Sequence, residues 1–413
     1  MPIPSLLPLA ALLAAPIAAP ATAPVQPPVP APLSASADPR AAWAGRSALA
    51  PDAETRWIPF DLTPGNQIRF TMALDGRPVT AILDTGVSYS VLARRYADAH
   101  GLAVQAEGRA TAIGGTVAIG RVATQRLAIG AVTRRGGSLG VADLPAAATG
   151  GTRAIDLLVG RDLTAPYALD IDYRARRFRL LRSGSRPFAG VAAPLTIAPD
   201  LRIYLGAIAV GGRAIAPMVV DTGDGSAITL GPAAWAHART AAGPVTSTVS
   251  FGLAGPVVFD MAILPEVRVG ETEARDVEVR VEPVGGFSDT IGVAGRIGSG
   301  FLQRYRVLLD PTAGHMLLAP TAAAATPPVR STSGLLLGLT GDRLKVLHVM
   351  RGSPAAAGGW RDGDMICTID GARVRADYAT SALAGWATAA AGRSVTLGDC
   401  TGGRRRLMLR RFY

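Results

Sequence analysis

One short motif occurs twice in this chain, and its duplication restricts the fold more than any other feature. Asp84-Thr85-Gly86 and Asp221-Thr222-Gly223 each follow three apolar residues. At offsets equal to within one residue, each copy is followed by an apolar residue and a glycine, Val159-Gly160 and Ile297-Gly298. A pattern that recurs at a fixed distance indicates two copies of one structural unit. We therefore predict a first repeat at residues 51–188 and a second repeat at residues 189–320.

Within both repeats, apolar residues form short stretches between turn-forming residues. Residues 68–74, for example, are mostly apolar and are followed by Asp75-Gly76. Such stretches predict hairpin-rich β structure. At Ala93–Ala99, alanine and charged residues replace the β-branched ones, which predicts a helix. The expected fold is therefore mainly β.

The duplicated motif predicts that the carboxyl groups of Asp84 and Asp221 meet. The glycines Gly86 and Gly223 would let the other repeat approach closely, and the hydroxyls of Thr85 and Thr222 could hydrogen-bond across the boundary. Two adjacent carboxylates cannot both ionise, so they share one proton and can hold a water molecule. One acts as general base on that water while the other polarises a peptide carbonyl. This chemistry needs no cofactor and no metal, and the four histidines show no metal-ligand spacing.

Residues 55–320 resemble the pepsin and retropepsin superfamily of aspartic proteases, in the bacterial form in which two retropepsin-like lobes are fused. In that family each lobe pairs an Asp-Thr-Gly loop with a later segment of two apolar residues and a glycine, matched here by residues 158–160 and 296–298. The resemblance implies a two-lobed, pseudo-twofold β-barrel fold and aspartic endopeptidase activity on polypeptide substrates. It also implies a monomer, because both catalytic aspartates lie on one polypeptide.

Three residues depart from the family pattern. The residue after Asp-Thr-Gly is commonly Ser or Ala, but it is Val87 in the first repeat and Asp224 in the second. Arg296 stands where an apolar residue is usual. Asp224 would either raise the pKa values of the carboxyl pair or point into solvent. Asp224 and Arg296 motivate an alternative, a catalytically inactive peptide-binding protein of the same fold.

The resemblance further implies a glycine-bearing β-hairpin that folds over the substrate as a flap. The candidate flap residues are Ile113, Gly114 and Gly115 in the first repeat and Gly252 in the second. Glycine would allow such a flap to open and close. The alternative is that both segments are ordinary hairpin turns.

Residues 331–413 resemble a PDZ domain of the bacterial type that is attached to proteases. The resemblance rests on residues 352–358, 361–366 and 369–371, in which Ser353-Pro354 predicts the start of a short helix. It implies a small α+β domain that takes an extended peptide, often the C-terminus of another protein, as an added strand. The candidate peptide-binding residues are Gly334, Leu335, Leu336 and Leu337. The alternative is a module that packs on the protease and binds nothing.

The N-terminal residues predict export. Residues 1–23 are rich in Leu and Ala and end in small residues, which is typical of a signal peptide and favours a periplasmic or secreted protein. A retained anchor and a cytoplasmic tail are the alternatives, because no Lys or Arg precedes the apolar stretch. Residues 24–50 and 321–330 are rich in Ala and Pro and are predicted to be linkers. No later apolar run is long enough to span a membrane.

The charge and cysteine content of the sequence bear on nucleic-acid binding and on disulfide formation. The formal net charge is +11, but aromatic residues make up only 5% of the sequence and the arginines are scattered. Nucleic-acid binding would favour a basic stripe interleaved with aromatic residues, so we expect no nucleic-acid partner. The two cysteines, Cys367 and Cys400, lie in apolar segments of the C-terminal domain. Either a disulfide or two buried thiols would fit.

Overall fold

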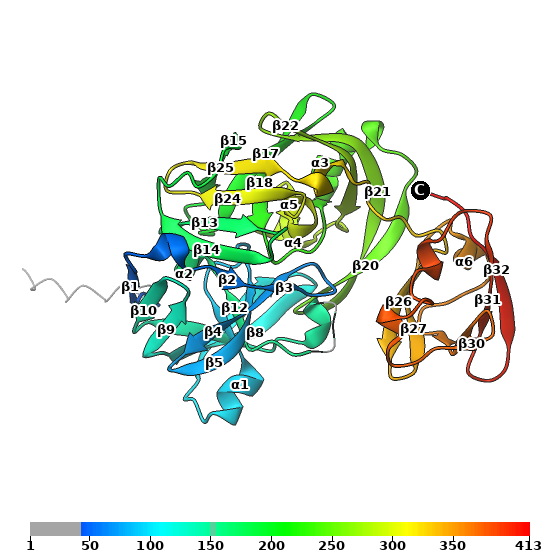
Figure 1. Cartoon of the computed structure of the whole chain (residues 1–413), viewed down its shortest axis with the longest axis horizontal. Coiled ribbons are helices and arrows are strands. Elements are labelled where there is room, and N and C mark those ends of the chain that lie inside the picture. The colour runs from blue at the N-terminus through cyan, green and yellow to red at the C-terminus, as the bar shows by residue number, and fades with distance from the viewer. Residues whose placement is uncertain (1–42, 150, 152) are drawn as a thin grey trace, which may run out of the picture. The chain divides into compact units, whose positions relative to one another are not determined.

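The computed structural model describes residues 43–149, 151 and 153–413. The predicted signal peptide at 1–23, and the predicted linker as far as residue 42, lie outside the described residues. The described part of the protein is mainly β, as predicted, and its strands form five sheets (Figure 1).

A tight hairpin near the start of the first repeat shows how the sequence produces these strands. Strand β4 (Ile68–Leu74) alternates between buried and more exposed residues, which is the pattern of a strand with one face in the core. Asp75 and Gly76 then turn the backbone with φ of 47° and 80°, and β5 (Arg77–Leu83) pairs back along β4. An Asp-Gly pair suits a turn that needs two positive φ angles, so the predicted hairpin is confirmed.

The first repeat contains an 11-stranded sheet with the order β1-β10-β9-β4-β5-β12-β6-β11-β8-β7, and β3 pairs with β4. Its other strands are β1 (Arg46–Leu49), β3 (Asp61–Leu62), β6 (Val91–Ala93), β7 (Gln105–Ala112), β8 (Gly115–Ala123), β9 (Arg126–Ile129), β10 (Val132–Arg135), β11 (Ser138–Ala142) and β12 (Leu157–Val159).

The second repeat contains an 8-stranded sheet with the order β16-β17-β18-β23-β19-β22-β21-β20. Its strands are β16 (Thr196–Ile197), β17 (Tyr204–Val210), β18 (Arg213–Asp221), β19 (Ile228–Leu230), β20 (Thr246–Gly252), β21 (Gly255–Val269), β22 (Thr272–Val281) and β23 (Gly295–Gly298).

The two sheets share one strand order. The path β4-β5-β12-β6-β11-β8-β7 corresponds strand by strand to β17-β18-β23-β19-β22-β21-β20. The directions agree as well, because β5 and β12 are parallel, as are β18 and β23. The long strands β21 and β22 occupy the places that the first repeat divides among β8, β9, β10 and β11. The internal repeat in the sequence is therefore a repeat in topology.

A third sheet joins the repeats. It has the order β15-β25-β24-β13-β14-β2, with β13 and β14 from the first repeat beside β24 and β25 from the second. Within the antiparallel β13–β24 ladder, Leu169 pairs with Leu309 and Ile171 pairs with Val307. The strands are β2 (Ile58–Pro59), β13 (Tyr167–Asp172), β14 (Arg177–Arg182), β15 (Val191–Pro194), β24 (Tyr305–Asp310) and β25 (His315–Pro320). Equivalent strands of the two repeats thus pair with each other.

Helices in the described residues are short. The predicted helix at Ala93–Ala99 is confirmed as α1 (Arg94–Ala99). Sequence reasoning missed α3 (Pro232–Ala238), although Gly231 and Pro232 at its start and its alanines are helix signals. The remaining helices and 3-10 turns are α2 (Arg161–Thr164), α4 (Phe287–Ile291), α5 (Ser299–Leu302), α6 (Pro354–Ala357), η2 (Ala53–Thr55), η3 (Ala146–Thr149), η4 (Arg239–Ala241), η5 (Ala322–Ala325), η6 (Tyr378–Thr380) and η7 (Trp386–Thr388).

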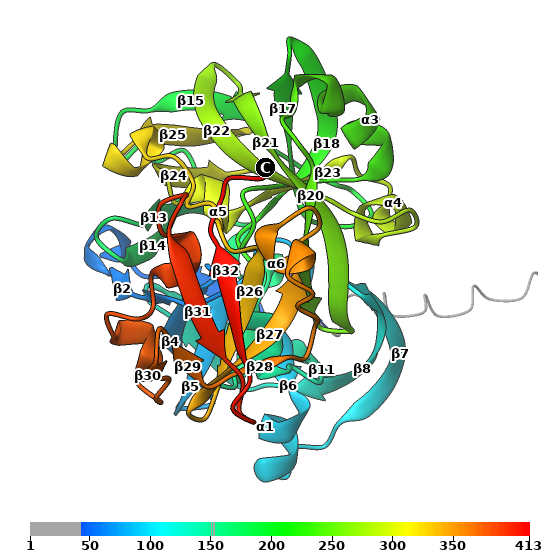
Figure 2. The same cartoon turned by 90° about the vertical axis from the view of Figure 1, so that its right-hand side faces the viewer.

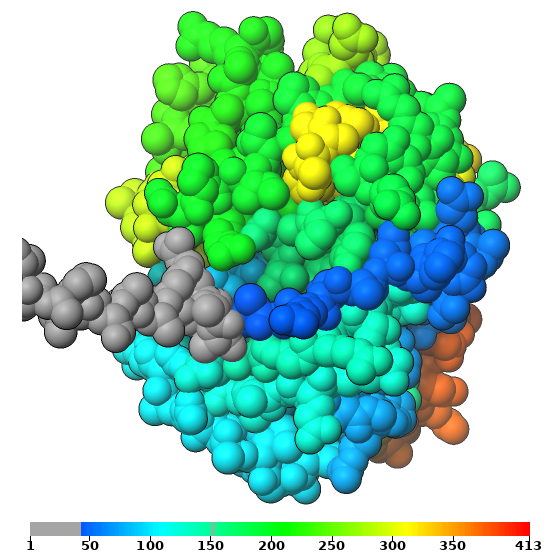
Figure 3. Space-filling view, turned by 90° about the vertical axis from the view of Figure 1, so that its left-hand side faces the viewer, coloured from blue at the N-terminus to red at the C-terminus, as the bar shows by residue number. Residues whose placement is uncertain are grey.

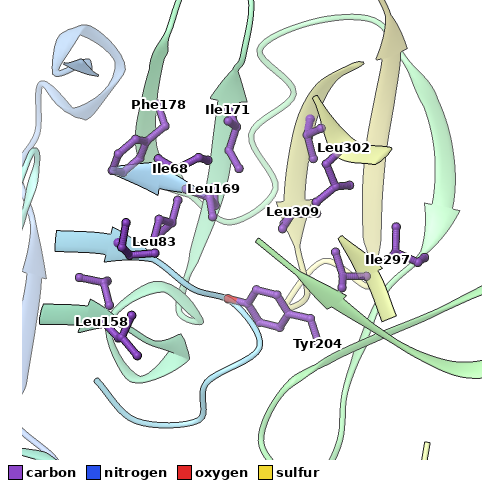
Figure 4. Packing of buried hydrophobic residues seen from close by; sticks show 14 of the residues in the cluster. Ile68, Leu83, Leu158, Leu169, Ile171, Phe178, Tyr204, Ile297, Leu302 and Leu309 are labelled. Carbon is purple, nitrogen blue, oxygen red and sulfur yellow. The ribbon is translucent and has the colours of Figure 1, made fainter. Parts of the chain in front are cut away.

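One apolar core runs through both repeats. Figure 4 shows Leu83 and Leu158 of the first repeat and Ile297 and Leu309 of the second, with Tyr204 between them. The Tyr204 side chain is fully buried, and its hydroxyl hydrogen-bonds with the Thr164 hydroxyl of the first repeat at 3.1 Å. A continuous core fixes the position of one repeat against the other, and with it the geometry of any site at their boundary.

The C-terminal residues have an apolar core cluster of their own, and Cys367 and Cys400 form a disulfide among them. The sheets here are β26-β27-β28 and β30-β29-β31-β32. The predicted helix start is confirmed, because the Ser353 hydroxyl caps α6 by accepting a hydrogen bond from the Ala356 N–H at 3.1 Å. The strands are β26 (Leu335–Thr340), β27 (Arg343–Val349), β28 (Met365–Ile366), β29 (Thr368–Ile369), β30 (Ala372–Arg373), β31 (Ser394–Gly398) and β32 (Arg404–Met408).

The C-terminal residues contact the β20–β21 hairpin of the second repeat. The Ser247 hydroxyl of β20 lies 2.8 Å from His348 Nε2 on β27, and the Arg351 N–H donates to the same hydroxyl at 3.1 Å. Arg351 also forms an ion pair with Asp260 of β21 at 2.5 Å. Figure 2 shows β20 and β27 near each other in this region. Polar and charged groups therefore hold β27 against the hairpin.

Both segments predicted as linkers contain ordered structure. Residues 46–49, within the predicted linker 24–50, form β1 and pair with β10, so the linker prediction was wrong for these residues. Figure 3 shows the first described residues, in blue, running across one face of the molecule. In the predicted linker 321–330, Ala322–Ala325 form η5, whose N-cap Thr321 accepts a hydrogen bond from the Ala323 N–H. Pairing with β10 satisfies backbone N–H and C=O groups of residues 46–49. The Ala-rich sequence alone does not reveal this pairing.

Candidate active site

The two aspartates of the duplicated motif lie at equivalent places. Asp84 directly follows β5, and its N–H donates to the Val159 carbonyl of β12 at 2.9 Å. Asp221 ends β18 and pairs with Gly298 of the parallel strand β23. The apolar residues before each aspartate are buried, so the strand ends are anchored in the core. The structure brings the two carboxyl groups together, close enough for the charge of Asp221 to act on Asp84.

The two threonines of the motif cross-link the repeats. The Thr85 hydroxyl donates to the Val220 carbonyl at 2.7 Å and accepts from the Thr222 N–H at 3.0 Å. The Thr222 hydroxyl donates to the Leu83 carbonyl at 2.8 Å and accepts from the Thr85 N–H at 3.1 Å. Both threonines are completely buried. These reciprocal bonds fix the two aspartate loops against each other.

The two glycines of the motif leave room for the opposite carboxyl group. A methyl group on Gly86 would overlap the carboxyl group of Asp221, and one on Gly223 would overlap that of Asp84. A side chain at either position would therefore push the aspartates apart. The close approach predicted from Gly86 and Gly223 is therefore confirmed.

Burial and mutual repulsion favour the protonated forms of both aspartates. Burial and the charge of Asp221 raise the pKa of Asp84 well above its ordinary value. Burial and the charge of Asp224 raise the pKa of Asp221 to about 6, although Arg296 opposes this. Two adjacent carboxyls with raised pKa values retain one proton between them near neutral pH. One can therefore accept a proton while the other donates one.

The structure shows where the unusual residue Asp224 points. Its side chain is only 9% exposed and forms an ion pair with Arg296 at 2.8 Å, so it does not project into solvent. Burial alone would raise the pKa of Asp224, but Arg296 and the Ser226 N–H lower it to about 2. Arg296 also forms an ion pair with Glu282 at 2.5 Å. The two departures in the second repeat, Asp224 and Arg296, are thus partners.

A cleft of about 750 Å³ includes both aspartates in its lining. The cleft is also lined by Ile113 and Gly252, two of the predicted flap residues, whereas Gly114 and Gly115 line a smaller neighbouring cavity of about 270 Å³. A volume of several hundred Å³ is typical of ligand sites. The cleft is large enough for several side chains of a peptide.

The tips of two hairpins, β7–β8 and β20–β21, meet beside this cleft. The Ala254 N–H donates to the Ile113 carbonyl at 3.3 Å. Gly114 and Gly255 turn the backbone there with φ of 93° and 119°, a region that favours glycine. A methyl group on Gly252 would overlap the Ile113 carbonyl. The predicted flap residues therefore lie at hairpin tips that contact each other.

The four predicted peptide-binding residues near the start of residues 331–413 occupy different surroundings. Leu336 and Leu337 line the cleft together with the carboxyl pair. Leu335 is buried in the C-terminal core cluster. Gly334 has φ of 80° and packs against Ser353. All four lie on or next to β26, which is an edge strand of its sheet.

Sequence reasoning missed two residues that support the second aspartate loop. The Gln67 side-chain amide donates to the carbonyls of Gly223 and Ala148, each at 3.0 Å. The Asn66 side-chain amide donates to the Gly225 carbonyl at 3.1 Å. The Pro-Gly-Asn sequence at 64–66 indicated a turn, but no sequence signal connected it to a motif so far along the polypeptide.

One comparison with known proteins found a match to part of the chain. Residues 70–163 match a family model described as aspartyl protease, and the matched range contains Asp84 and Gly160. The match supports an aspartic protease family, a protease-type function and polypeptide substrates. A search of curated proteins found no match.

A membrane-spanning helix and a metal-binding group are both absent from the described residues. No helix among them is both long and apolar enough to cross a bilayer. No group of three or more His, Cys, Asp or Glu side chains within the described ranges is arranged to hold a metal ion.

Proposed function

We propose that this protein is an aspartic endopeptidase with a two-lobed fold, in which Asp84 and Asp221 activate a water molecule. One observation carries the proposal: the carboxyl groups of two equivalent loops meet in a large cleft, locked by reciprocal threonine hydrogen bonds. The aspartyl protease match to residues 70–163 supports the same conclusion.

In the proposed mechanism, the ionised aspartate removes a proton from the water, and the protonated aspartate hydrogen-bonds to the carbonyl of the scissile peptide bond. The oxygen of the water attacks the carbonyl carbon, giving a tetrahedral intermediate. A proton then passes to the leaving nitrogen, the C–N bond breaks, and the pair returns to sharing one proton. The two hairpin tips would cover the bound peptide and exclude bulk water.

The alternative, a protein of the same fold that binds peptides without cleaving them, is favoured by the position of Asp224. This extra carboxylate accepts hydrogen bonds from Ser226 and Thr229 close to the carboxyl pair, and it raises the pKa of Asp221 in addition to the effect of burial. If the combined negative charge kept both catalytic aspartates protonated at working pH, no general base would be available.

We expect the full-length protein to cleave an unbiased peptide library and a statine-type inhibitor to block the cleavage. Product termini identified by mass spectrometry at several pH values would give the specificity. An Asp84→Asn variant is the control for contaminating peptidases and should give no products. Tight binding of the inhibitor without any library cleavage would instead establish the binding protein.

We further propose that the C-terminal residues form a PDZ domain that helps to hold the substrate. Leu336 is 36% exposed on the edge strand β26, and it lines the cleft together with Leu337 and Leu347. An edge strand presents unpaired N–H and C=O groups to which an extended peptide can add. A polypeptide bound at the carboxyl pair would then continue onto β26.

Replacing Leu336 with aspartate should raise KM for long polypeptides about 10-fold and leave kcat for short peptides unchanged, because only long substrates would reach β26. The matched control is Met408→Asp, which alters an apolar residue of the same domain that is 53% exposed on β32. Equal KM values for the two variants on long substrates would show that β26 takes no part in binding.

We also propose that the protein is exported and that it is a monomer. The Cys367–Cys400 disulfide supports an oxidising compartment such as the periplasm, because cytosolic thiols are normally kept reduced. Both aspartates of the proposed pair come from one polypeptide, so a second copy is not needed to complete the site. Fractionation of cells that express the full-length protein would place it, and mass measurement in solution would give its oligomeric state.

A further inference from the structure

The two repeats differ in charge at one pair of equivalent positions next to the aspartates. In the first repeat these positions hold Val87, which packs against the main core cluster, and the buried Leu158. In the second repeat they hold Asp224 and Arg296, whose carboxylate and guanidinium lie 2.8 Å apart. A buried ion pair has therefore taken the place of an apolar pair on one side of the carboxyl pair.

This ion pair is fully supported by its surroundings. Asp224 also accepts hydrogen bonds from the Ser226 N–H at 2.9 Å and the Thr229 hydroxyl at 3.0 Å. On its other side, Arg296 contacts Glu282 at 2.5 Å. The Arg296 side chain is only 1% exposed. Charges buried to this degree are tolerated only when they are paired and hydrogen-bonded, so the position of Arg296 is closely fixed.

As a result, the two catalytic aspartates have unequal surroundings. One oxygen of Asp221 accepts hydrogen bonds from the Gly223 and Asp224 N–H groups at 2.9 and 3.0 Å, and the other lies 3.9 Å from Arg296 Nε. Asp84 accepts a bond from the Gly86 N–H at 3.0 Å. The N–H of Val87 points instead to the backbone carbonyl of Asp84, at 3.4 Å.

Hydrogen bonds and a nearby positive charge stabilise an ionised carboxylate over a protonated one. We propose that Arg296, held in place by Asp224 and Glu282, is a positioning residue that keeps the negative charge of the pair on Asp221 and the shared proton on Asp84. The inference rests on the proposed peptidase function and assigns its starting state. Asp221 is then the general base for the water, and Asp84 is the acid that hydrogen-bonds to the peptide carbonyl.

The charges that face Asp221 act in opposite directions. Asp84 and Asp224 disfavour its ionised form, and Arg296 favours it. Behind them, Glu282 faces Arg296, and Arg280 acts on Asp224. Burial would lower the pKa of Arg296, but the carboxylates around it raise that pKa, so the arginine stays charged. The pKa of Asp84 is raised by burial and by Asp221, which agrees with Asp84 holding the proton.

Two variants should therefore move the acid limb of the kcat/KM profile in opposite directions. That limb reports the pKa of the general base in the free enzyme. Asp224→Asn removes a negative charge and should move the limb to lower pH by about 1 unit. Arg296→Leu, combined with Glu282→Gln so that no unpaired glutamate is left, should move the limb to higher pH by about 1 unit.

Three further variants separate this effect from general damage to the fold. Glu282→Gln alone is the background control for the double variant, and Arg296→Lys, which keeps the positive charge, should leave the limb near that of the parent. Asp162→Asn disrupts the buried Asp162–Arg134 ion pair of the first repeat, which is 2.9 Å long. This variant should lower Tm without moving the limb. Limbs that stay in place, or that move in the same direction in both charge variants, would overturn the inference.

A measurement without turnover tests the same assignment. In protein labelled with ¹³C at the aspartate carboxyl carbons, Asp84→Asn and Asp221→Asn identify the two resonances. In the parent, Asp221 should ionise at lower pH than Asp84, and the order should reverse or the gap should shrink in the Arg296→Leu/Glu282→Gln variant. If Asp84 ionises first in the parent, the inference is wrong even in an active enzyme. If the parent cleaves no peptide, the proposed function fails, and the order of ionisation still tests the role of Arg296.

Discussion

Replacing either Asp84 or Asp221 with asparagine should lower kcat/KM for peptide cleavage by about 10⁴-fold, because each variant removes one half of the acid–base pair. Asparagine is close to aspartate in size and can keep the hydrogen bond from the Gly86 or Gly223 N–H. The loss should therefore appear mainly in kcat, while the affinity for a statine-type inhibitor changes less. Initial rates on a peptide chosen from the library would measure both parameters.

Asp221→Asn should also stabilise the protein, and this gain distinguishes it from a variant that loses activity because it fails to fold. The pKa of Asp221 is raised from its ordinary value to about 6 by burial and by Asp224. A protein with such a carboxyl loses folding stability as pH rises from about 4 to about 6, because the unfolded protein releases this proton at a lower pH than the folded protein does. Asp221→Asn has no such loss, so its Tm at pH 7 should exceed that of the parent. A lower Tm together with lost activity would point to a structural defect instead.

The second large effect is expected at the threonine cross-link. Thr85→Val removes the partner of the Val220 carbonyl and of the Thr222 N–H, and Thr222→Val does the same to the Leu83 carbonyl and the Thr85 N–H. Each buried group left without a partner costs about 1–3 kcal/mol. The double variant should therefore lose at least about 4 kcal/mol, which corresponds to roughly 5 °C in Tm for a protein of this length. Calorimetry on both single variants and the double variant would measure this loss.

Serine provides the matched control for the cross-link. A Thr85→Ser/Thr222→Ser variant keeps both hydroxyls and should recover most of the lost stability and activity. If the serine double variant melts at a lower temperature than the valine double variant, methyl packing matters more than the hydrogen bonds. Activity lost in the valine variant while Tm is kept would show that the bonds align the aspartates without holding the repeats together.

Most of the fold in the repeats was predictable because its signals are local. A mostly apolar stretch followed by Asp-Gly predicted the β4–β5 hairpin, and alanine with charged residues predicted α1. The strand β1 was missed because pairing with β10 orders it, and no local pattern reveals a partner so far along the sequence. The continuous strand β21, where the first repeat has two, was hidden for the same reason.

The candidate site was predictable as far as the motif reaches. The duplicated triplets pointed to two carboxyls that meet, and the structure brings Asp84 and Asp221 together. The direction of Asp224 could not be read from sequence, because it depends on Arg296, which lies on a different strand. In the sequence the two residues are separate departures from the family pattern, and only the fold brings them into contact. The roles of the flap and PDZ residues stay predictions.

The β13–β24 ladder has a consequence for how this protein could have arisen. Leu169 pairs with Leu309, and the residues equivalent to them in the other repeat, Val307 and Ile171, pair in the same way. Such a contact is isologous, so its hydrogen bonds do not distinguish two strands of one polypeptide from strands of two identical half-length polypeptides. Free halves would form like pairs as well as unlike ones. Joining them in one polypeptide ensures that every molecule pairs one arginine-bearing half with one apolar half. The two aspartates therefore have unequal surroundings in every molecule.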